Sequence, residues 1–187
     1  ILTNKLIATI QVLSNNRFLL GIGAGYLEEE FKALGVPLRR RGKITDETLA
    51  FLNSTSRDPL IESNNQPFLL NPVLPRPPIY IGGKAEVAIP RSIKYGDGWM
   101  PVGLQPEQLR TDIESFNGRA TAAGKESPEI IAMKTLPLDN ITVAIELAQH
   151  YQEVGVTQLV HTQGYESPTH YAEVVEQVDT EIRNRLN

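Results

Sequence analysis

Cysteine is absent from this chain of 187 residues, tryptophan occurs once and histidine three times. Without cysteine, the chain has no disulfide bonds, no thiolate ligands for zinc and no cysteine nucleophile. His150, His161 and His170 show neither the spacing of a metal site with carboxylates nor a serine partner for a catalytic triad. We therefore expect no metal centre and no triad chemistry, and only His161, at the end of a predicted strand, lies where a site residue is expected.

The chain also lacks a basic surface and a long apolar run. Eighteen Lys and Arg against 22 Asp and Glu give a net charge of −4, and the only cluster of basic residues is Arg39-Arg40-Arg41. We therefore expect no nucleic-acid partner. No signal-peptide pattern or membrane span is present, so we expect a cytoplasmic protein that does not bind membranes. Because the chain opens at Ile1, inside an amphipathic helical pattern, we expect that further sequence precedes it.

Strand and helix patterns alternate along the whole chain. Hydrophobic residues make up 41% of it, which is enough for the core of a single domain over residues 1–187. Five continuous apolar runs are typical of strands in a parallel sheet covered on both faces. They span residues 18–22, 79–81, 98–102, 129–136 and 157–161. A closed (β/α)₈ barrel needs eight strands and about 250 residues, so the sequence predicts an α/β fold that is either an open sheet or an incomplete barrel.

Several residues mark where the helices begin and end. Pro106 suits the first position of one helix, Asp139 is predicted to cap the next, Gly155 to end it, and Ser167-Pro168 to open the last. Pro90 is expected to kink a helix or to mark its first turn.

Two further segments carry predictions. Five apolar residues predict an N-terminal helix, namely Leu2, Leu6, Ile7, Ile10 and Leu13. Residues 53–78, dense in Asn, Ser and Pro, predict a long excursion without regular structure.

Two apolar runs end in glycine turns and carry most of the functional information. They are Arg17–Tyr26, which contains Gly21, Gly23 and Gly25, and Pro77–Gly83, which is followed by Gly96–Pro101. Glycines at a strand's end leave backbone N–H groups uncovered, and such groups bind phosphate. The Gly-x-Gly-x-Gly spacing alone also fits a dinucleotide-binding turn. However, the acidic residue that such a turn requires would have to be Asp46, which falls inside a helical pattern.

Three blocks, in this order, resemble the luciferase-like monooxygenase family: Arg17–Tyr26 with the residues following to Gly42, Pro77–Gly83, and Tyr95–Pro101. The resemblance is strongest to the subgroup that uses the deazaflavin coenzyme F420 rather than FMN. It implies a (β/α)₈ TIM-barrel fold with the cofactor at the C-terminal ends of the strands. The strand at Phe18 would then be the fourth of the barrel, so about five of eight βα units are present.

The resemblance also implies site residues. Gly82 and Gly83 match the family's phosphate-binding turn, and Lys84 would add a positive charge to it. Gly98, Trp99, Met100 and Pro101 would close the other side of the phosphate pocket, while Gly25 and Tyr26 would lie on the side of the cofactor ring and the substrate. The alternatives are a tight strand-to-helix turn at Gly82-Gly83, packing of the Trp99 side chain in the core, and simple packing of the Tyr26 side chain. No catalytic residue is identified.

The first functional hypothesis is an oxidoreductase or monooxygenase that moves a hydride between reduced coenzyme F420 or FMN and a small organic substrate. The alternative is a truncated, non-catalytic fragment that binds a phosphorylated ligand or serves as part of an assembly. A barrel that binds some other phosphorylated compound is a third possibility. Since an incomplete barrel exposes strand edges and apolar surface, we expect a homodimer.

Overall fold

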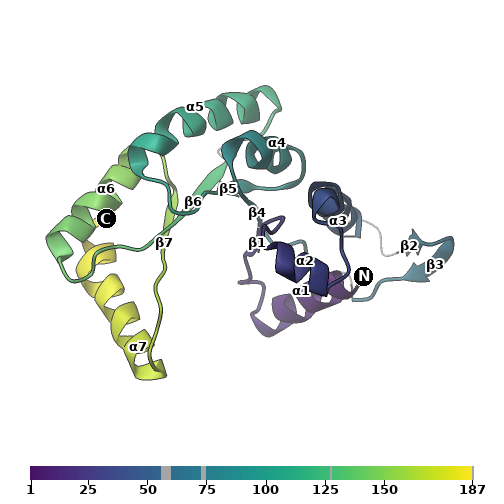
Figure 1. The fold of residues 1–187 in the computed structure, drawn as a ribbon, viewed down its shortest axis with the longest axis horizontal. Coiled ribbons are helices and arrows are strands. Elements are labelled where there is room, and N and C mark those ends of the chain that lie inside the picture. The colour runs from purple at the N-terminus through teal and green to yellow at the C-terminus, as the bar shows by residue number, and fades with distance from the viewer. Residues whose placement is uncertain (56–59, 73–74, 127, 187) are drawn as a thin grey trace. The chain divides into compact units, whose positions relative to one another are not determined.

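The computed structural model describes residues 1–55, 60–72, 75–126 and 128–186 (Figure 1). The chain divides into two compact units, Ile1–Asp97 and Gly98–Asn187. In each unit, parallel strands alternate with helices, which confirms the expected α/β class.

Unit 1 is built on a pair of parallel strands, β1 and β4. Its elements are α1 (Leu2–Leu13), β1 (Leu20–Ile22), α2 (Glu28–Ala33), the 3₁₀ helix η1 (Leu38–Arg40), α3 (Arg41–Thr55), β2 (Leu60–Ser63), β3 (Gln66–Leu69), β4 (Ile79–Gly82) and α4 (Ala85–Tyr95). Leu20 lies opposite Ile79, and Ile22 opposite Ile81. Because the two strands run in the same direction, the loops that follow Ile22 and Gly82 leave from the same edge of the pair.

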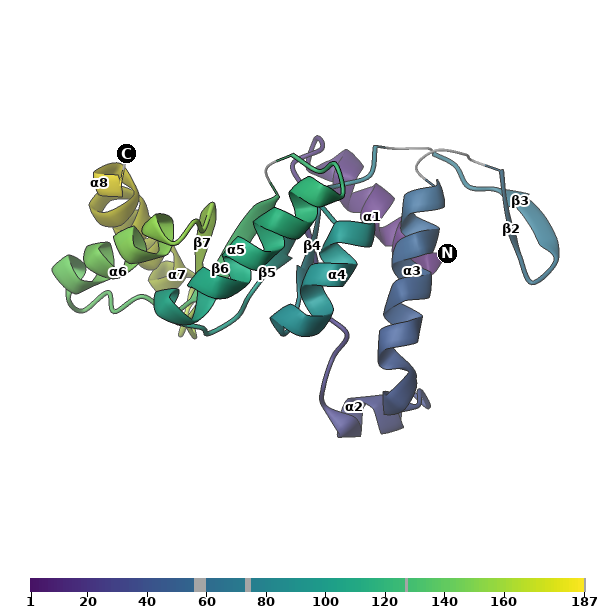
Figure 2. The ribbon, with the colours of Figure 1, turned by 90° about the horizontal axis from the view of Figure 1, so that it is seen from above.

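The core of unit 1 forms around β4, whose residues Ile79–Ile81 are at most 2% exposed. Helices α3 and α4 lie side by side (Figure 2), and Arg91 of α4 forms an ion pair with Asp46 of α3 at 2.6 Å. Gly96 lets the end of α4 approach β4, since a Cβ atom there would lie 2.9 Å from the backbone oxygen of Ile79. The glycine is therefore required by close packing.

The prediction of an unstructured excursion over residues 53–78 was wrong in part. The described residues of this segment include the end of α3 and an antiparallel hairpin in which β2 pairs with β3, Ser63 lying opposite Gln66. Asn64 and Asn65 join the two strands with φ values of 52° and 59°. A two-residue turn with both φ values positive suits a hairpin, and asparagine tolerates it well. Residues 56–59 and 73–74 lie outside the described part of the segment.

Helix α1 forms as predicted, but its buried face differs from the predicted apolar pattern. Ile7, Ala8 and Gln11 are buried, whereas Leu2, Leu6 and Leu13 are 73%, 56% and 80% exposed. In α4, Pro90 lies inside the helix and not in its first turn, so one residue there cannot donate the usual helical hydrogen bond.

Unit 2 contains three parallel strands with β6 in the middle. Its elements are β5 (Gly98–Met100), α5 (Pro106–Ala122), β6 (Glu129–Lys134), α6 (Ile141–Glu153), β7 (Gln158–His161), α7 (Pro168–Gln177), the π-helix η2 (Val178–Arg183) and α8 (Asn184–Leu186). Strand β6 pairs in parallel with β5 and with β7. The apolar face of α5 is buried, and it consists of Leu109, Ile113, Phe116 and Ala120.

Most predicted helix ends in unit 2 are confirmed. Pro106 opens α5, Gly155 follows α6 with a φ of +97°, and Ser167 accepts a hydrogen bond from His170 N at 3.0 Å. The predicted cap at Asp139 was wrong, because Asn140 caps α6 by accepting from Val143 N at 3.3 Å. An N-cap side chain must reach an N–H two or three residues ahead, and Asn140 has that spacing. None of the helices in the described ranges is long and apolar enough to cross a bilayer.

Candidate functional site

The predicted phosphate turn lies where β4 meets α4. Gly82 is half-buried at the end of the strand, Gly83 is exposed, and Lys84 is exposed at the N-cap position of the helix. Gly83 has a φ of +128°, and a Cβ atom there would meet nothing closer than Ala88 Cβ at 3.9 Å. The backbone conformation, rather than lack of space, therefore restricts this position to glycine.

The first turn of α4 faces the same loop. Val87 N and Ala88 N donate to the backbone oxygen of Lys84 at 3.1 Å and 2.9 Å. The N–H groups that precede them, at Ala85 and Glu86, have no acceptor within the helix, as at every helix N-terminus. These groups and the helix dipole favour an anion, Lys84 adds a positive charge, and Glu86 carries a charge of the opposite sign.

Gly25 and Tyr26 lie in the loop after β1, at the same edge of the strand pair as Gly83. Gly25 has a φ of +75°, and a Cβ atom there would lie 3.1 Å from the ring of Phe31, so this glycine allows Phe31 of α2 to approach the loop. Tyr26 is 81% exposed. This exposure contradicts the alternative of simple packing for Tyr26, and it leaves the phenol accessible to a ligand.

The residues predicted from unit 2 lie in and just after β5. Gly98 and Trp99 pair with Glu129 and Ile130 of β6. Trp99 is fully buried, at 0% exposed, so its indole packs in the core and is not available for stacking on a cofactor. The backbone oxygen of Pro101 accepts from Met133 N at 3.0 Å, while Met100 is half-buried. A role for Gly98–Pro101 in phosphate binding stays a prediction.

His161 is held in place by both of its ring nitrogens. Its Nδ1 accepts from Leu136 N at 3.0 Å, and its Nε2 lies 2.9 Å from Gln163 Oε1, an arrangement that fits a neutral ring protonated at Nε2. The hydrogen bond from Leu136 N to His161 therefore connects the segment after β6 to the end of β7. Within the described ranges, no group of three or more His, Asp or Glu residues could hold a metal ion.

Unit 1 therefore combines the predicted phosphate turn between β4 and α4 with a second glycine loop at the same edge of β1 and β4, and in both units parallel strands alternate with helices. Residues 1–184 match the sequence model of the luciferase-like monooxygenase family. The chain belongs to this family.

Relatives and solved structures are similar to the chain over most of its length. Uncharacterized proteins of Mycobacterium bovis and Mycobacterium tuberculosis are each 29% identical over 98% of the chain. The chain spans 63% of the length of these relatives. An F420-dependent secondary alcohol dehydrogenase in complex with an F420-acetone adduct has a TM-score of 0.71 at 15% identity, covering 95% of this chain and 74% of that one.

A coenzyme F420-dependent tetrahydromethanopterin reductase from Methanopyrus kandleri has a TM-score of 0.70 at 12% identity, covering 100% of this chain and 79% of that one. A monooxygenase from Streptomyces bottropensis has a TM-score of 0.56 at 19% identity over 81% of this chain and 52% of that one. At these identities the similarity shows the fold, which is an incomplete (β/α)₈ barrel of the luciferase-like type.

Proposed function

We propose that this chain is the cofactor-binding part of an oxidoreductase that uses coenzyme F420, with FMN as the alternative cofactor, to transfer a hydride to or from a small organic substrate. The main observation in support is the turn between β4 and α4, where Gly83 has a φ of +128° and the exposed Lys84 precedes the helix. Family membership over residues 1–184 supports the class of reaction.

The turn fits a phosphate group of the cofactor. Gly83 is exposed and has no side chain to block a phosphate, and the first N–H groups of α4 follow after one residue, Lys84. Lys84 supplies a positive charge next to these N–H groups, as phosphate sites at helix N-termini commonly require. We assign the phosphate to Gly82, Gly83 and Lys84, and keep Gly98–Pro101 as a further prediction.

The bound cofactor would accept or donate the hydride. In this proposal, the residues of the chain bind the cofactor and orient the substrate. Gly83 and Lys84 hold the phosphate end, while Gly25 and Tyr26 lie on the side of the ring and the substrate, because both loops leave from the same edge of β1 and β4. The exposed Tyr26 hydroxyl would donate a hydrogen bond to a polar atom of the substrate, such as a carbonyl oxygen.

We also propose that the chain forms a homodimer through the outer face of α1. Leu2, Leu6, Ile10 and Leu13 share this face at intervals of four, four and three residues, and they are 73%, 56%, 42% and 80% exposed. A continuous apolar stripe of this kind is typical of a surface that contacts another protein. A second copy of the chain would supply a matching stripe.

The proposed function is tested by titrating the chain separately with coenzyme F420 and with FMN and following the cofactor's own fluorescence. We expect one of them to bind with micromolar affinity, and Gly83→Val to weaken this binding by about tenfold or more. Gly124→Val is the matched control, because Gly124 also has a positive φ, +71°, with no atom within 4 Å of a Cβ, and lies in the turn after α5. Equal loss of affinity in both variants would contradict the assignment.

The second candidate function is a fragment without activity of its own, which binds a phosphorylated ligand or serves in an assembly. The chain spans 63% of the length of its curated relatives, so this candidate needs its own test. A folded chain that binds neither cofactor would support this candidate. Cofactor binding together with oxidation or reduction of a substrate would exclude it.

A further inference from the structure

Three consecutive arginines, Arg39, Arg40 and Arg41, lie where η1 leads into α3 and form an arginine cluster. All three side chains are exposed. Arg41 Nη1 donates to the backbone oxygen of Leu38 at 3.1 Å. Within the described part of the chain, none of the three guanidinium groups forms an ion pair with a carboxylate. The positive charge of the cluster is therefore open to a partner outside the chain.

Two contacts set the register between α3 and α4. Arg91 Nε of α4 donates to Asp46 Oδ1 of α3 at 2.6 Å, and Asn53 Nδ2 of α3 donates to the backbone oxygen of Tyr95 at 2.9 Å. The contacts follow one another in the same order along both helices. The two helices therefore lie side by side and run in the same direction (Figure 2).

This register places the arginine cluster beside the first turn of α4. Arg41 precedes Asp46 by five residues and Glu86 precedes Arg91 by five, so Arg41 and Glu86 lie level along the two helices. Neighbouring helix axes are about 8–10 Å apart. The cluster therefore lies about 10 Å from the predicted phosphate turn, which directly precedes α4.

The backbone also places part of the cluster on the side of α4. Gly42 faces α4, because its backbone oxygen accepts from Arg91 Nη2 at 3.4 Å. Side chains three residues apart eclipse in a 3₁₀ turn, and η1 is such a turn. Arg39, three residues before Gly42, therefore lies on the side of η1 that faces α4.

The electrostatics of this edge favour an anion. Because α3 and α4 both begin there, the positive ends of both helix dipoles meet, and Lys84 adds a charge. The acidic groups of the neighbouring elements are Glu86 and the three glutamates of α2, of which Glu28 pairs with Lys32 at 3.1 Å. Guanidinium groups suit carboxylates and phosphates, since their planar donors can bind two oxygens at once.

We propose that Arg39 and Arg40 bind a second anionic group of the ligand whose phosphate occupies the turn at Gly83. This inference rests on the proposed function and deepens it, because it chooses between the two cofactors. Coenzyme F420 carries carboxylates on a tail that continues beyond its phosphate, whereas FMN ends at its phosphate. The arginine cluster is thus a subsite for the carboxylates of coenzyme F420.

The experiment titrates three proteins separately with coenzyme F420 and with FMN, following the cofactor's own fluorescence. They are the wild type, the double variant Arg39→Gln/Arg40→Gln, and the control Arg110→Gln/Arg119→Gln, which removes two exposed arginines from α5 in unit 2. Arg41 is kept because it donates to Leu38. We expect the wild type to bind coenzyme F420 about tenfold more tightly than FMN.

The cluster variant is expected to lose about tenfold in affinity for coenzyme F420 and less than about twofold for FMN. The control should lose less than about twofold for either cofactor. An unchanged affinity of the cluster variant for coenzyme F420, equal losses in both double variants, or a wild type that prefers FMN would overturn the inference. If binding still depends on Gly83 in these cases, the proposed function stands, whereas binding of neither cofactor overturns both.

A second measurement covers the case in which the cluster variant does not fold. In the ¹⁵N-labelled wild type, the Nε resonances of Arg39 and Arg40 should shift on addition of coenzyme F420 and stay in place with FMN. Unchanged resonances with bound coenzyme F420 would show that the arginines are only solvated, which would overturn the inference.

Discussion

Arg76 and Asp97 form a bidentate ion pair. It joins the segment before β4, which contains Arg76, to the loop after α4, which contains Asp97. Arg76 Nη1 lies 2.6 Å from Asp97 Oδ2, and Nη2 lies 2.8 Å from Oδ1. Ile79 N also donates to Asp97 Oδ2 at 2.7 Å, and Asp97 N donates to the backbone oxygen of Ile79 at 2.7 Å. The carboxylate therefore fixes the start of β4 and acts as a structural group.

Replacing Asp97 with Asn is predicted to lower the free energy of unfolding by about 2 kcal/mol, because hydrogen bonds to charged groups contribute about 1.5–3 kcal/mol. Denaturant unfolding measures the change. Glu28→Gln is the control, since the pair of Glu28 with Lys32 is 60% and 73% exposed and is expected to contribute less than about 0.5 kcal/mol. Similar changes in the two variants would contradict the structural role of Asp97.

Burial raises the pKa of Tyr151, and the charge of Glu107 raises it further. The phenol is buried in α6 and donates to the backbone oxygen of Leu104. Because the folded-state pKa exceeds the unfolded value of about 10, the stability contributed by the neutral phenol is complete below pH 10. It is lost as the pH rises through the folded-state pKa.

Tyr151→Phe is therefore predicted to lower the free energy of unfolding by about 1 kcal/mol at neutral pH, because the hydrogen bond is lost. Above pH 10, the variant is predicted to lose less stability than the wild type does. Denaturant unfolding at several pH values from neutral upward compares the two proteins. If the free energy of unfolding falls equally above pH 10 in the two proteins, ionisation of Tyr151 does not cause the loss of stability.

Lys84 and Glu86 are predicted to affect anion binding in opposite directions. Lys84→Gln should weaken and Glu86→Gln should strengthen the binding of the cofactor, each by about two- to fivefold, the equivalent of about 0.3–1 kcal/mol at a helix N-terminus. Both effects should shrink as salt is added. Titrations at low and high ionic strength test this, and changes of the same sign in the two variants would rule out a phosphate at this turn.

If the chain forms the proposed homodimer, Leu6→Glu is predicted to convert it to a monomer, because the substitution places a charge in the middle of the apolar stripe on α1. Leu34→Glu is the control, since Leu34 is 76% exposed and lies after α2, outside the stripe. Sedimentation of the wild type and both variants measures the mass. A wild-type monomer, or an unchanged mass for Leu6→Glu, would contradict the proposed interface.

The sequence predicted those features that depend on local chemistry. Ser167 and Gly155 were assigned to their helix ends because capping and positive φ are properties of single residues. The parallel strands β1, β4, β5, β6 and β7 were found as continuous apolar runs, and the three glycine blocks indicated the family. Tertiary contacts could not be predicted in this way. Arg76 and Asp97 lie 21 residues apart, and no pattern in the sequence indicates that they pair.

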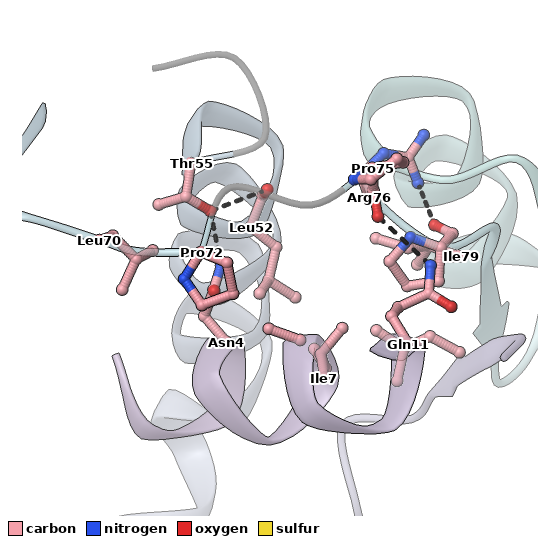
Figure 3. A pocket seen from close by; sticks show the side chains of 13 residues that line it. Asn4, Ile7, Gln11, Leu52, Thr55, Leu70, Pro72, Pro75, Arg76 and Ile79 are labelled. Atoms are coloured by element: carbon pink, nitrogen blue, oxygen red, sulfur yellow. Dashed lines mark hydrogen bonds between the residues drawn. The ribbon is translucent and has the colours of Figure 1, made fainter. Parts of the chain in front are cut away.

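Two errors have physical explanations. The hairpin of β2 and β3 was missed because the composition of its segment suggests a loop. Its turn, Asn64-Asn65, forms because asparagine adopts positive φ values more readily than most residues. The inner face of α1 was missed because the apolar pattern places the leucines on the outer face, while the polar residues Asn4 and Gln11 line a pocket beneath the helix (Figure 3). Polar residues spaced seven apart were the available signal.

The most direct test of the proposed cofactor site is to follow the backbone amides of the ¹⁵N-labelled chain by NMR while coenzyme F420, and separately FMN, is added. We predict saturable shifts at Gly83, Lys84, Ala85 and Glu86 with the cofactor that binds, and smaller ones at Gly124. Saturable shifts elsewhere that leave the turn between β4 and α4 unchanged, or no binding of either cofactor by the folded chain, would contradict the proposed site.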